Sequence, residues 1–224
     1  MSDPLNLSTL DADGAIRDAA EATGIDRGAF LRRGAIAGGG IIAGSAMFGT
    51  FLSSAEAAIS STKRSKKNDG AILNYALTLE YLEAAFYKQA VANAAYGNDA
   101  NLKKFAETVA AHEAAHVKFL KGALKSAAVK SPKFDFGAAV TDQKTFAATA
   151  QVLEDTGVSA YLGQVGNILQ LPVLKAAGTI ATVEARHAAW IRFINGDTPA
   201  PAAFDTPKSE KAVLKAVTAT KFIQ

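Results

Sequence analysis

A two-fold repeat of polar residues constrains the fold of this chain more than any other feature. In each half of residues 70–195, a glutamate is followed seven residues later by a tyrosine and then by a Glu-x-x-His pair. The repeated residues are Glu80, Tyr87, Glu113 and His116, and then Glu154, Tyr161, Glu184 and His187. The two glutamates are 33 residues apart in the first half and 30 in the second. Offsets of three and seven residues place side chains on one face of a helix, whereas a strand would place them on opposite faces. The repeat therefore predicts helices.

Four long stretches show apolar residues with a helical period. They run roughly over residues 70–93, 99–127, 142–168 and 171–195. The short joint around Pro172 predicts that the last two helices are antiparallel neighbours, and residues 131–137 are long enough to cross over a bundle. The expected fold is all-α: an antiparallel four-helix bundle over residues 70–196, with a long crossover between helices two and three. Residues 197–224 form a tail with a short helix expected to begin near Thr206-Pro207.

The repeated polar residues share their helix faces with apolar side chains. In the second stretch, the stripe that holds Glu113 and His116 also contains Leu102, Phe105, Val109 and Leu120. The other three stretches show the same arrangement around their own glutamates. Four carboxylates and two imidazoles are therefore predicted to lie in the core.

Such a cluster needs positive partners. Burial of an unpaired carboxylate costs several kcal/mol, and no lysine or arginine on those faces offers neutralisation. Two divalent cations would satisfy the cluster. One glutamate from each of two helices, with Glu-x-x-His from each of the other two, is a known di-iron or di-manganese arrangement in helix bundles. The chain has no cysteine, so oxygen and imidazole ligands must hold any metal.

Two features leave alternatives open. His112 and His116 also spell the HExxH signature of zinc proteases. That interpretation leaves the other half of the repeat without a role, and His112 is expected at the surface or beside the metal ligands. Tyr87 and Tyr161 lie two turns from a glutamate, where a hydrogen bond to a carboxylate and plain core packing are equally compatible with the spacing.

The first 57 residues differ from the rest of the chain. A polar, acidic stretch over residues 1–26 is followed by Arg32-Arg33, a soft apolar run over residues 35–52, and the small-x-small site at Ala55-Glu56-Ala57. The segment resembles a twin-arginine (Tat) export signal, although the arginine pair follows Phe-Leu rather than preceding it. Export to the periplasm or cell envelope is expected; the alternatives are an uncleaved membrane anchor and a cytoplasmic protein. Residues 58–69 are expected to be a basic linker.

The sequence around the repeat resembles the ferritin-like superfamily, and more narrowly the bacterial ferritin-like domain proteins related to plant desiccation-related proteins. Residues 73–83, 154–161 and 184–190 carry this resemblance, which extends over roughly 68–196. It implies one metal held by Glu80, Glu113 and His116, and a second held by Glu154, Glu184 and His187. Glu113 and Glu184 would be the bridging carboxylates, and Glu83 could replace Glu80 if the first helix were rotated.

The resemblance implies a redox function. We expect an exported di-metal protein with two iron ions, or alternatively manganese, that binds iron and oxidises Fe(II) with dioxygen or peroxide. The alternatives are a manganese catalase-like enzyme and a structural, stress-protective envelope protein whose bundle is clamped by metal. The expected partners are metal ions and a small oxidant. The net charge of +3 with no aromatic-basic pattern argues against nucleic acid. Envelope association and a homo-oligomer remain open.

Overall fold

The computed structural model describes residues 59–224, and the export segment predicted over residues 1–57 lies outside them. Within the described residues the chain is helical, with a single isolated β-bridge. The α-helices are α5 (Lys66–Ala92), α6 (Ala100–Leu124), α7 (Gln143–Val165), α8 (Leu171–Ile194) and α9 (Glu210–Thr220). None of the helices in residues 59–224 is both long and apolar enough to cross a membrane.

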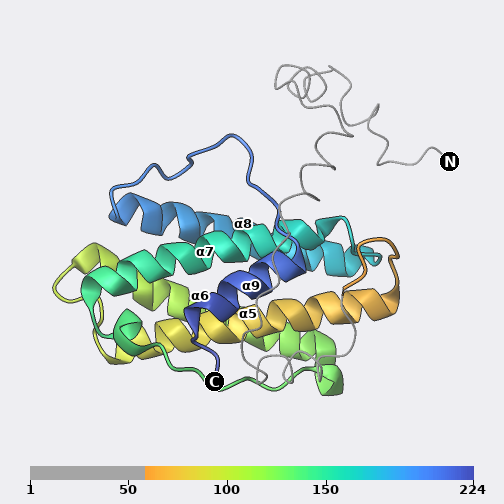
Figure 1. The fold of residues 1–224 in the computed structure, drawn as a ribbon, viewed down its shortest axis with the longest axis horizontal. Helices are drawn as coiled ribbons and strands as arrows, with labels where there is room; N and C mark the ends of the chain where they lie inside the picture. Colours follow the sequence, from red (N-terminus) through yellow and green to blue (C-terminus); the bar gives the residue numbers. More distant parts are fainter. Residues whose placement is uncertain (1–58) are drawn as a thin grey trace. The chain divides into compact units, whose positions relative to one another are not determined.

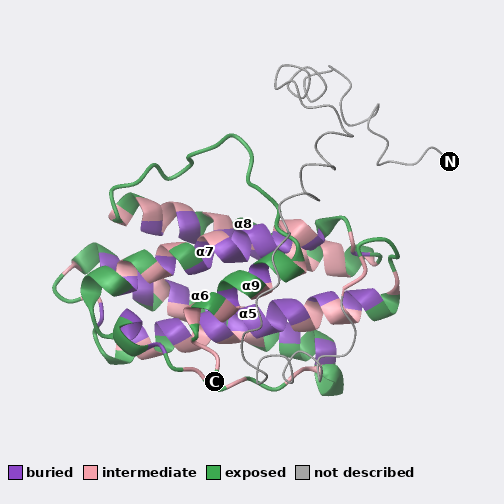
Figure 2. Cartoon of the chain, viewed as in Figure 1, coloured by how far each residue is buried: buried purple, intermediate pink, exposed green. Residues whose placement is uncertain are grey.

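The first four of these helices form the predicted bundle. α5 packs mainly on α6, and α7 packs mainly on α8 (Figure 1). The crossover between α6 and α7 contains two 3-10 helices, η1 (Lys125–Ala127) and η2 (Gly137–Val140). Buried residues line the inward faces of all four helices (Figure 2). The prediction of an all-α bundle with a long crossover and a short C-terminal helix is confirmed.

Capping side chains set where the helices begin. The Asp99 side chain accepts hydrogen bonds from the backbone amides of Asn101 and Leu102, in the first turn of α6. α5 begins earlier than expected, because the Ser65 hydroxyl accepts a hydrogen bond of 3.1 Å from the Asn68 amide. Lys66 and Lys67, expected in the basic linker, therefore lie in its first turn.

The turn that leads into α8 is tied to another helix. The buried carboxylate of Asp69, on α5, accepts hydrogen bonds of 2.8 Å from the Leu169 amide and 2.9 Å from the Gln170 amide. Both amides precede the first residue of α8, and Gln170 is its N-cap residue. Asp69 thereby ties the turn between α7 and α8 to α5.

The C-terminal tail packs across the bundle. α9 lies over the face formed by α5 and α7 (Figure 1), and its Val213 and Val217 are buried in the core. The helix begins at Glu210, rather than near Thr206-Pro207 as predicted, because Ser209 supplies the N-cap. Beyond α9, the Phe222 carbonyl accepts a hydrogen bond of 2.9 Å from the Asp135 amide, which ties the tail to the crossover.

Gly163 allows the tail to approach α7 closely. A Cβ atom at this position would lie 1.8 Å from the Lys208 carbonyl oxygen, far inside van der Waals contact. We expect Gly163→Ala to displace the tail and to lower the free energy of unfolding by about 1–3 kcal/mol. Chemical denaturation measures this change.

Gly122→Ala is the matched control, since a Cβ at Gly122, near the end of α6, would meet no atom within 4 Å. It should raise stability by up to about 1 kcal/mol, because alanine has the higher helix propensity. Equal stabilisation by both substitutions would contradict the close packing of the tail.

Candidate metal centre

All six predicted ligands lie together in the core of the bundle. Each of the four helices contributes: Glu80 from α5, Glu113 and His116 from α6, Glu154 from α7, and Glu184 and His187 from α8. The four carboxylates have no exposed surface, and His187 is 3% exposed. His116 is partly exposed, with 12% of its side chain open to solvent.

Within residues 59–224, these side chains form two overlapping groups that could each hold a metal ion. The first group is Glu80, Glu113, His116 and Glu184, and the second is Glu113, Glu154, Glu184 and His187. In each group, one ligand atom from every residue lies within 4.8 Å of the others. Glu113 and Glu184 belong to both groups, which is the arrangement expected of carboxylates that bridge two ions.

Both imidazoles direct Nδ1 at carboxylates. Nδ1 of His116 lies 3.1 Å from Glu80, 3.2 Å from Glu113 and 3.3 Å from Glu184. Nδ1 of His187 lies 3.2 Å from Glu154 and 3.3 Å from Glu113. His116 therefore faces the carboxylate of its own group and both shared carboxylates, whereas His187 faces the carboxylate of its own group and one shared carboxylate.

Unpaired polar atoms show that the cluster fits divalent cations. Among the described residues, Oε1 of Glu113, Oε2 of Glu154, both carboxylate oxygens of Glu184, and Nδ1 of His187 are buried without a hydrogen-bond partner. A buried acceptor without a partner costs about 1–3 kcal/mol, and more when it is charged. All of these atoms are potential ligands at the centre of the cluster. Oxygen and imidazole donors of this kind suit iron or manganese.

The electrostatics of the metal-free cluster are unfavourable. Burial, and then repulsion from neighbouring carboxylates, raises the pKa values of Glu83, Glu113 and Glu184 well above 4.5. Burial lowers the pKa of His116, but its contacts with the surrounding glutamates outweigh this effect and raise the pKa to about 12. Burial likewise opposes ionisation of Glu80, yet contacts with His116 and other neighbours lower its pKa. In the absence of metal, His116 thus supplies the compensating positive charge.

The two tyrosines of the repeat hydrogen-bond carboxylates in a crossed arrangement. The Tyr87 hydroxyl, on α5, donates to Glu154 on α7, and the Tyr161 hydroxyl, on α7, donates to Glu80 on α5. Both rings are buried. Each tyrosine thus orients a glutamate of the opposite half of the repeat, and the spacing alone did not distinguish this role from packing.

His112 lies beside the cluster and belongs to neither group. It is exposed, its ring stacks on that of His187 with centroids 5.1 Å apart, and its Nδ1 lies 2.8 Å from Nε2 of His187. The protease interpretation would require His112 and His116 to bind one zinc ion. Here the two imidazoles contact different partners, so the arrangement does not support that interpretation.

Gly157 was not singled out from the sequence, although it shapes the site. A Cβ at this position would lie 2.9 Å from Oε2 of Glu184 and 3.4 Å from Oε1 of Glu83. Glu83 is buried one turn from Glu80 and belongs to neither ligand group. The glycine leaves room for these two carboxylates. Its position in the middle of a helix, where glycine is unfavourable, was the available signal.

Gly157→Ala should weaken metal binding while the protein stays folded. The added methyl group would push the Glu184 carboxylate out of its position in both ligand groups. We expect a loss of about 10-fold or more in metal affinity, similar to the loss of a contact that supports a ligand. Isothermal titration with Fe(II) under anaerobic conditions measures the affinity.

Gly178→Ala, on α8, serves as the control, because a Cβ there would meet no atom within 4 Å. It should leave metal affinity unchanged. If both variants bind metal as the unmodified chain does, Gly157 has no role in positioning Glu184.

Removal of metal should make stability depend on pH. The pKa values of Glu83, Glu113 and Glu184 are raised in the folded protein, so their contribution to stability falls as pH rises above about 4.5. The contribution of His116 falls in the same direction, from about pH 6.5 towards 12. We expect the Tm of the metal-free protein to decrease from pH 5 to pH 9, and metal to restore most of the loss. Calorimetry that shows a constant or rising metal-free Tm would contradict this prediction.

Comparison with known proteins agrees with the fold. The sequence model of the ferritin-like domain family matches residues 68–197, which contain α5 through α8 except for the first two residues of α5, and all six candidate ligands. No protein with a curated description matches the chain. The matched region covers more than half of the chain, and the chain belongs to the ferritin-like domain family.

Proposed function

We propose that this chain is an exported di-metal carboxylate protein that binds iron and oxidises Fe(II) with dioxygen or peroxide. The observation that supports this proposal is the sharing of Glu113 and Glu184 between two buried four-residue groups. Two ions held by shared carboxylates lie close enough to react with one small molecule. The export part of the proposal rests on the sequence pattern of residues 1–57 alone.

The charge of the cluster suits two divalent ions. Four ionised glutamates would balance the four positive charges of such a pair, with both imidazoles neutral. Iron bound there would supply the electrons that reduce the oxidant. The chain itself supplies a site without bulk water, since the four carboxylates are fully buried. A buried polar site of this kind strengthens the electrostatic interactions inside it.

Residues next to the ligands hold the site in shape. The hydroxyl groups of Tyr87 and Tyr161 donate hydrogen bonds to Glu154 and Glu80, which fixes the orientation of these carboxylates. The contact between His112 and Nε2 of His187 orients the imidazole so that Nδ1 faces the cluster. Such supporting contacts typically contribute about 10- to 100-fold to metal affinity or activity.

The substitution Glu113→Gln tests the proposal. It preserves the size of the side chain but replaces a shared carboxylate with a neutral amide, so both ligand groups lose one charged ligand. We expect the metal content to fall from about two ions per chain to one or none, and Fe(II) oxidation to be lost. Elemental mass spectrometry gives the metal content, and the absorbance of Fe(III) follows the reaction.

Glu107→Gln is the matched control, since Glu107 lies on the exposed side of the same helix. It should keep both metal content and activity. Unchanged Fe(II) oxidation in Glu113→Gln would refute the proposal. Two manganese ions per chain, with oxygen evolved from peroxide, would instead support catalase-like chemistry. Bound metal without turnover, together with unfolding on metal removal, would support a structural role.

A further inference from the structure

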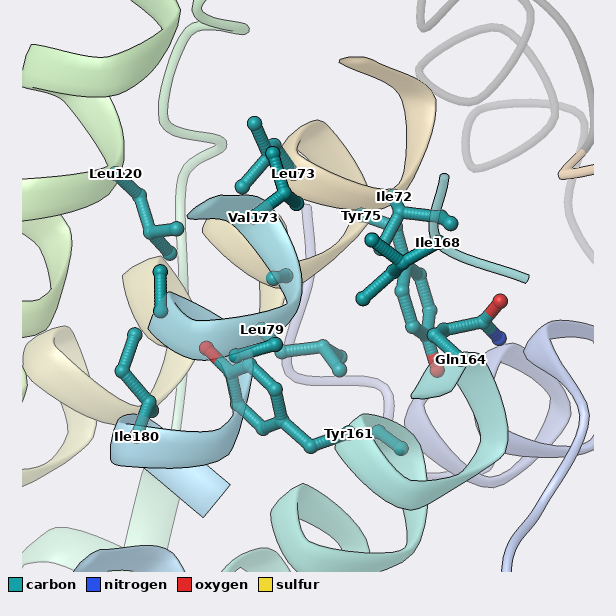
Figure 3. A pocket seen from close by; sticks show the side chains of 14 residues that line it. Ile72, Leu73, Tyr75, Leu79, Leu120, Tyr161, Gln164, Ile168, Val173 and Ile180 are labelled. Atoms are coloured by element: carbon teal, nitrogen blue, oxygen red, sulfur yellow. The ribbon is translucent and has the colours of Figure 1, made fainter. Parts of the chain in front are cut away.

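An apolar cavity lies between the helices of the bundle (Figure 3). Its volume is about 20 Å³. Residues from all four bundle helices line it, including Leu79, Leu120, Tyr161, Val173, Ala177 and Ile180. A space of this size accommodates one small molecule and is too small for an acyl chain or an aromatic ring.

The positions of its wall residues place the cavity beside the first ligand group. Leu120 lies one helical turn after His116, and Ile180 lies one turn before Glu184. Residues four apart on a helix are separated by about 6 Å along its axis. Tyr161 forms part of the wall, and its hydroxyl donates to Glu80. Three of the four residues of the first group are therefore next to the cavity or linked to it.

The polar atoms of the wall are unevenly placed. Figure 3 shows Tyr75 and Gln164 at one end of the cavity and Leu120 and Ile180 at the other. The Tyr75 hydroxyl is buried without a hydrogen-bond partner among the described residues, so the end at Tyr75 and Gln164 is the polar one. A buried water molecule needs two to four polar partners, and apolar cavities that lack them stay dry. Near Leu120 and Ile180 the Tyr161 hydroxyl is already bonded to Glu80. The end next to the ligands of the first group thus favours an apolar occupant.

We propose that this cavity holds dioxygen beside the first ligand group, and that dioxygen rather than peroxide is the oxidant reaching the iron through it. Dioxygen is small and apolar, so it partitions into such a space, whereas peroxide would lose its hydrogen bonds to water there. The choice of oxidant rests on the function proposed above. The presence of dioxygen in the cavity does not, because it depends on the shape and polarity of the wall.

Nuclear magnetic resonance detects dioxygen directly, because the molecule is paramagnetic. The full chain is loaded with zinc(II), which has no redox chemistry, and its methyl relaxation is compared under dioxygen and nitrogen pressure. We expect several-fold larger enhancement at the methyl groups of Leu120 than at those of Leu102. The two leucines are equally buried, at 1% exposure, but Leu102 does not line the cavity. Equal enhancement at both leucines would overturn the proposal.

Filling the cavity tests its part in the reaction. Ala177→Leu adds three carbon atoms to the wall on α8, and Ala123→Leu makes the same change at an exposed position of α6 outside the wall. We expect Ala177→Leu to remove the enhancement at Leu120. It should also slow Fe(II) oxidation by dioxygen several-fold while leaving oxidation by hydrogen peroxide unchanged. Ala123→Leu should change neither.

The outcomes separate this inference from the proposed function. Enhancement at Leu120 that disappears in Ala177→Leu supports the cavity even if the iron-loaded protein oxidises nothing, and in that case only the proposed function fails. Enhancement that persists in the filled variant overturns the cavity as the location of dioxygen. If the enhancement at Leu120 disappears in Ala177→Leu and the rate of Fe(II) oxidation by dioxygen is unchanged, the dioxygen route is overturned.

Discussion

The packing of this bundle depends on the burial of four carboxylates in one small volume. Four fully buried glutamates repel one another, and several of their oxygen atoms lack a hydrogen-bond partner among the described residues. An apolar core alone would exclude them. Two divalent cations would reverse the balance, because the same oxygens would then be ligands. The four helices bring these carboxylates together with the two imidazoles, and Gly157 leaves the space that the Glu184 carboxylate occupies.

The internal repeat explains how one chain builds a nearly symmetric centre. α5 and α6 contribute one Glu, Tyr and Glu-x-x-His set, and α7 and α8 contribute the other. The symmetry extends to the tyrosines, since the Tyr87 and Tyr161 hydroxyls each donate a hydrogen bond to a glutamate in the opposite half. The crossover between α6 and α7 allows the second helix pair to face the first. The tail then covers α5 and α7, where Val213 and Val217 complete the core.

The helical period of the sequence predicted the features that are determined within a single helix, such as the face on which a glutamate lies. It did not predict contacts between segments that are far apart in the sequence. The offsets of Glu80, Glu113, Glu154 and Glu184 determine their helix faces, so their shared position in the core followed from the sequence. The role of Gly157 could not be predicted from the helical period, because this glycine acts by leaving space for the carboxylate of Glu184. The hydrogen bond from the Leu169 amide, just before α8, to Asp69 joins residues 100 positions apart. α9 begins later than predicted because Ser209, rather than Thr206, is its N-cap residue.

Two sides of the centre differ in polarity, and this difference bears on how reactants reach it. His112 is exposed and contacts His187, while His116 is partly exposed, so α6 presents imidazoles between solvent and both ligand groups. Imidazole nitrogens are ligands that suit iron and other transition-metal ions. The apolar cavity adjoins the first ligand group elsewhere in the bundle, with Tyr161 and Ile180 in its wall. A polar approach suited to cations and an apolar space suited to dioxygen would keep the two reactants apart until they meet at the shared carboxylates.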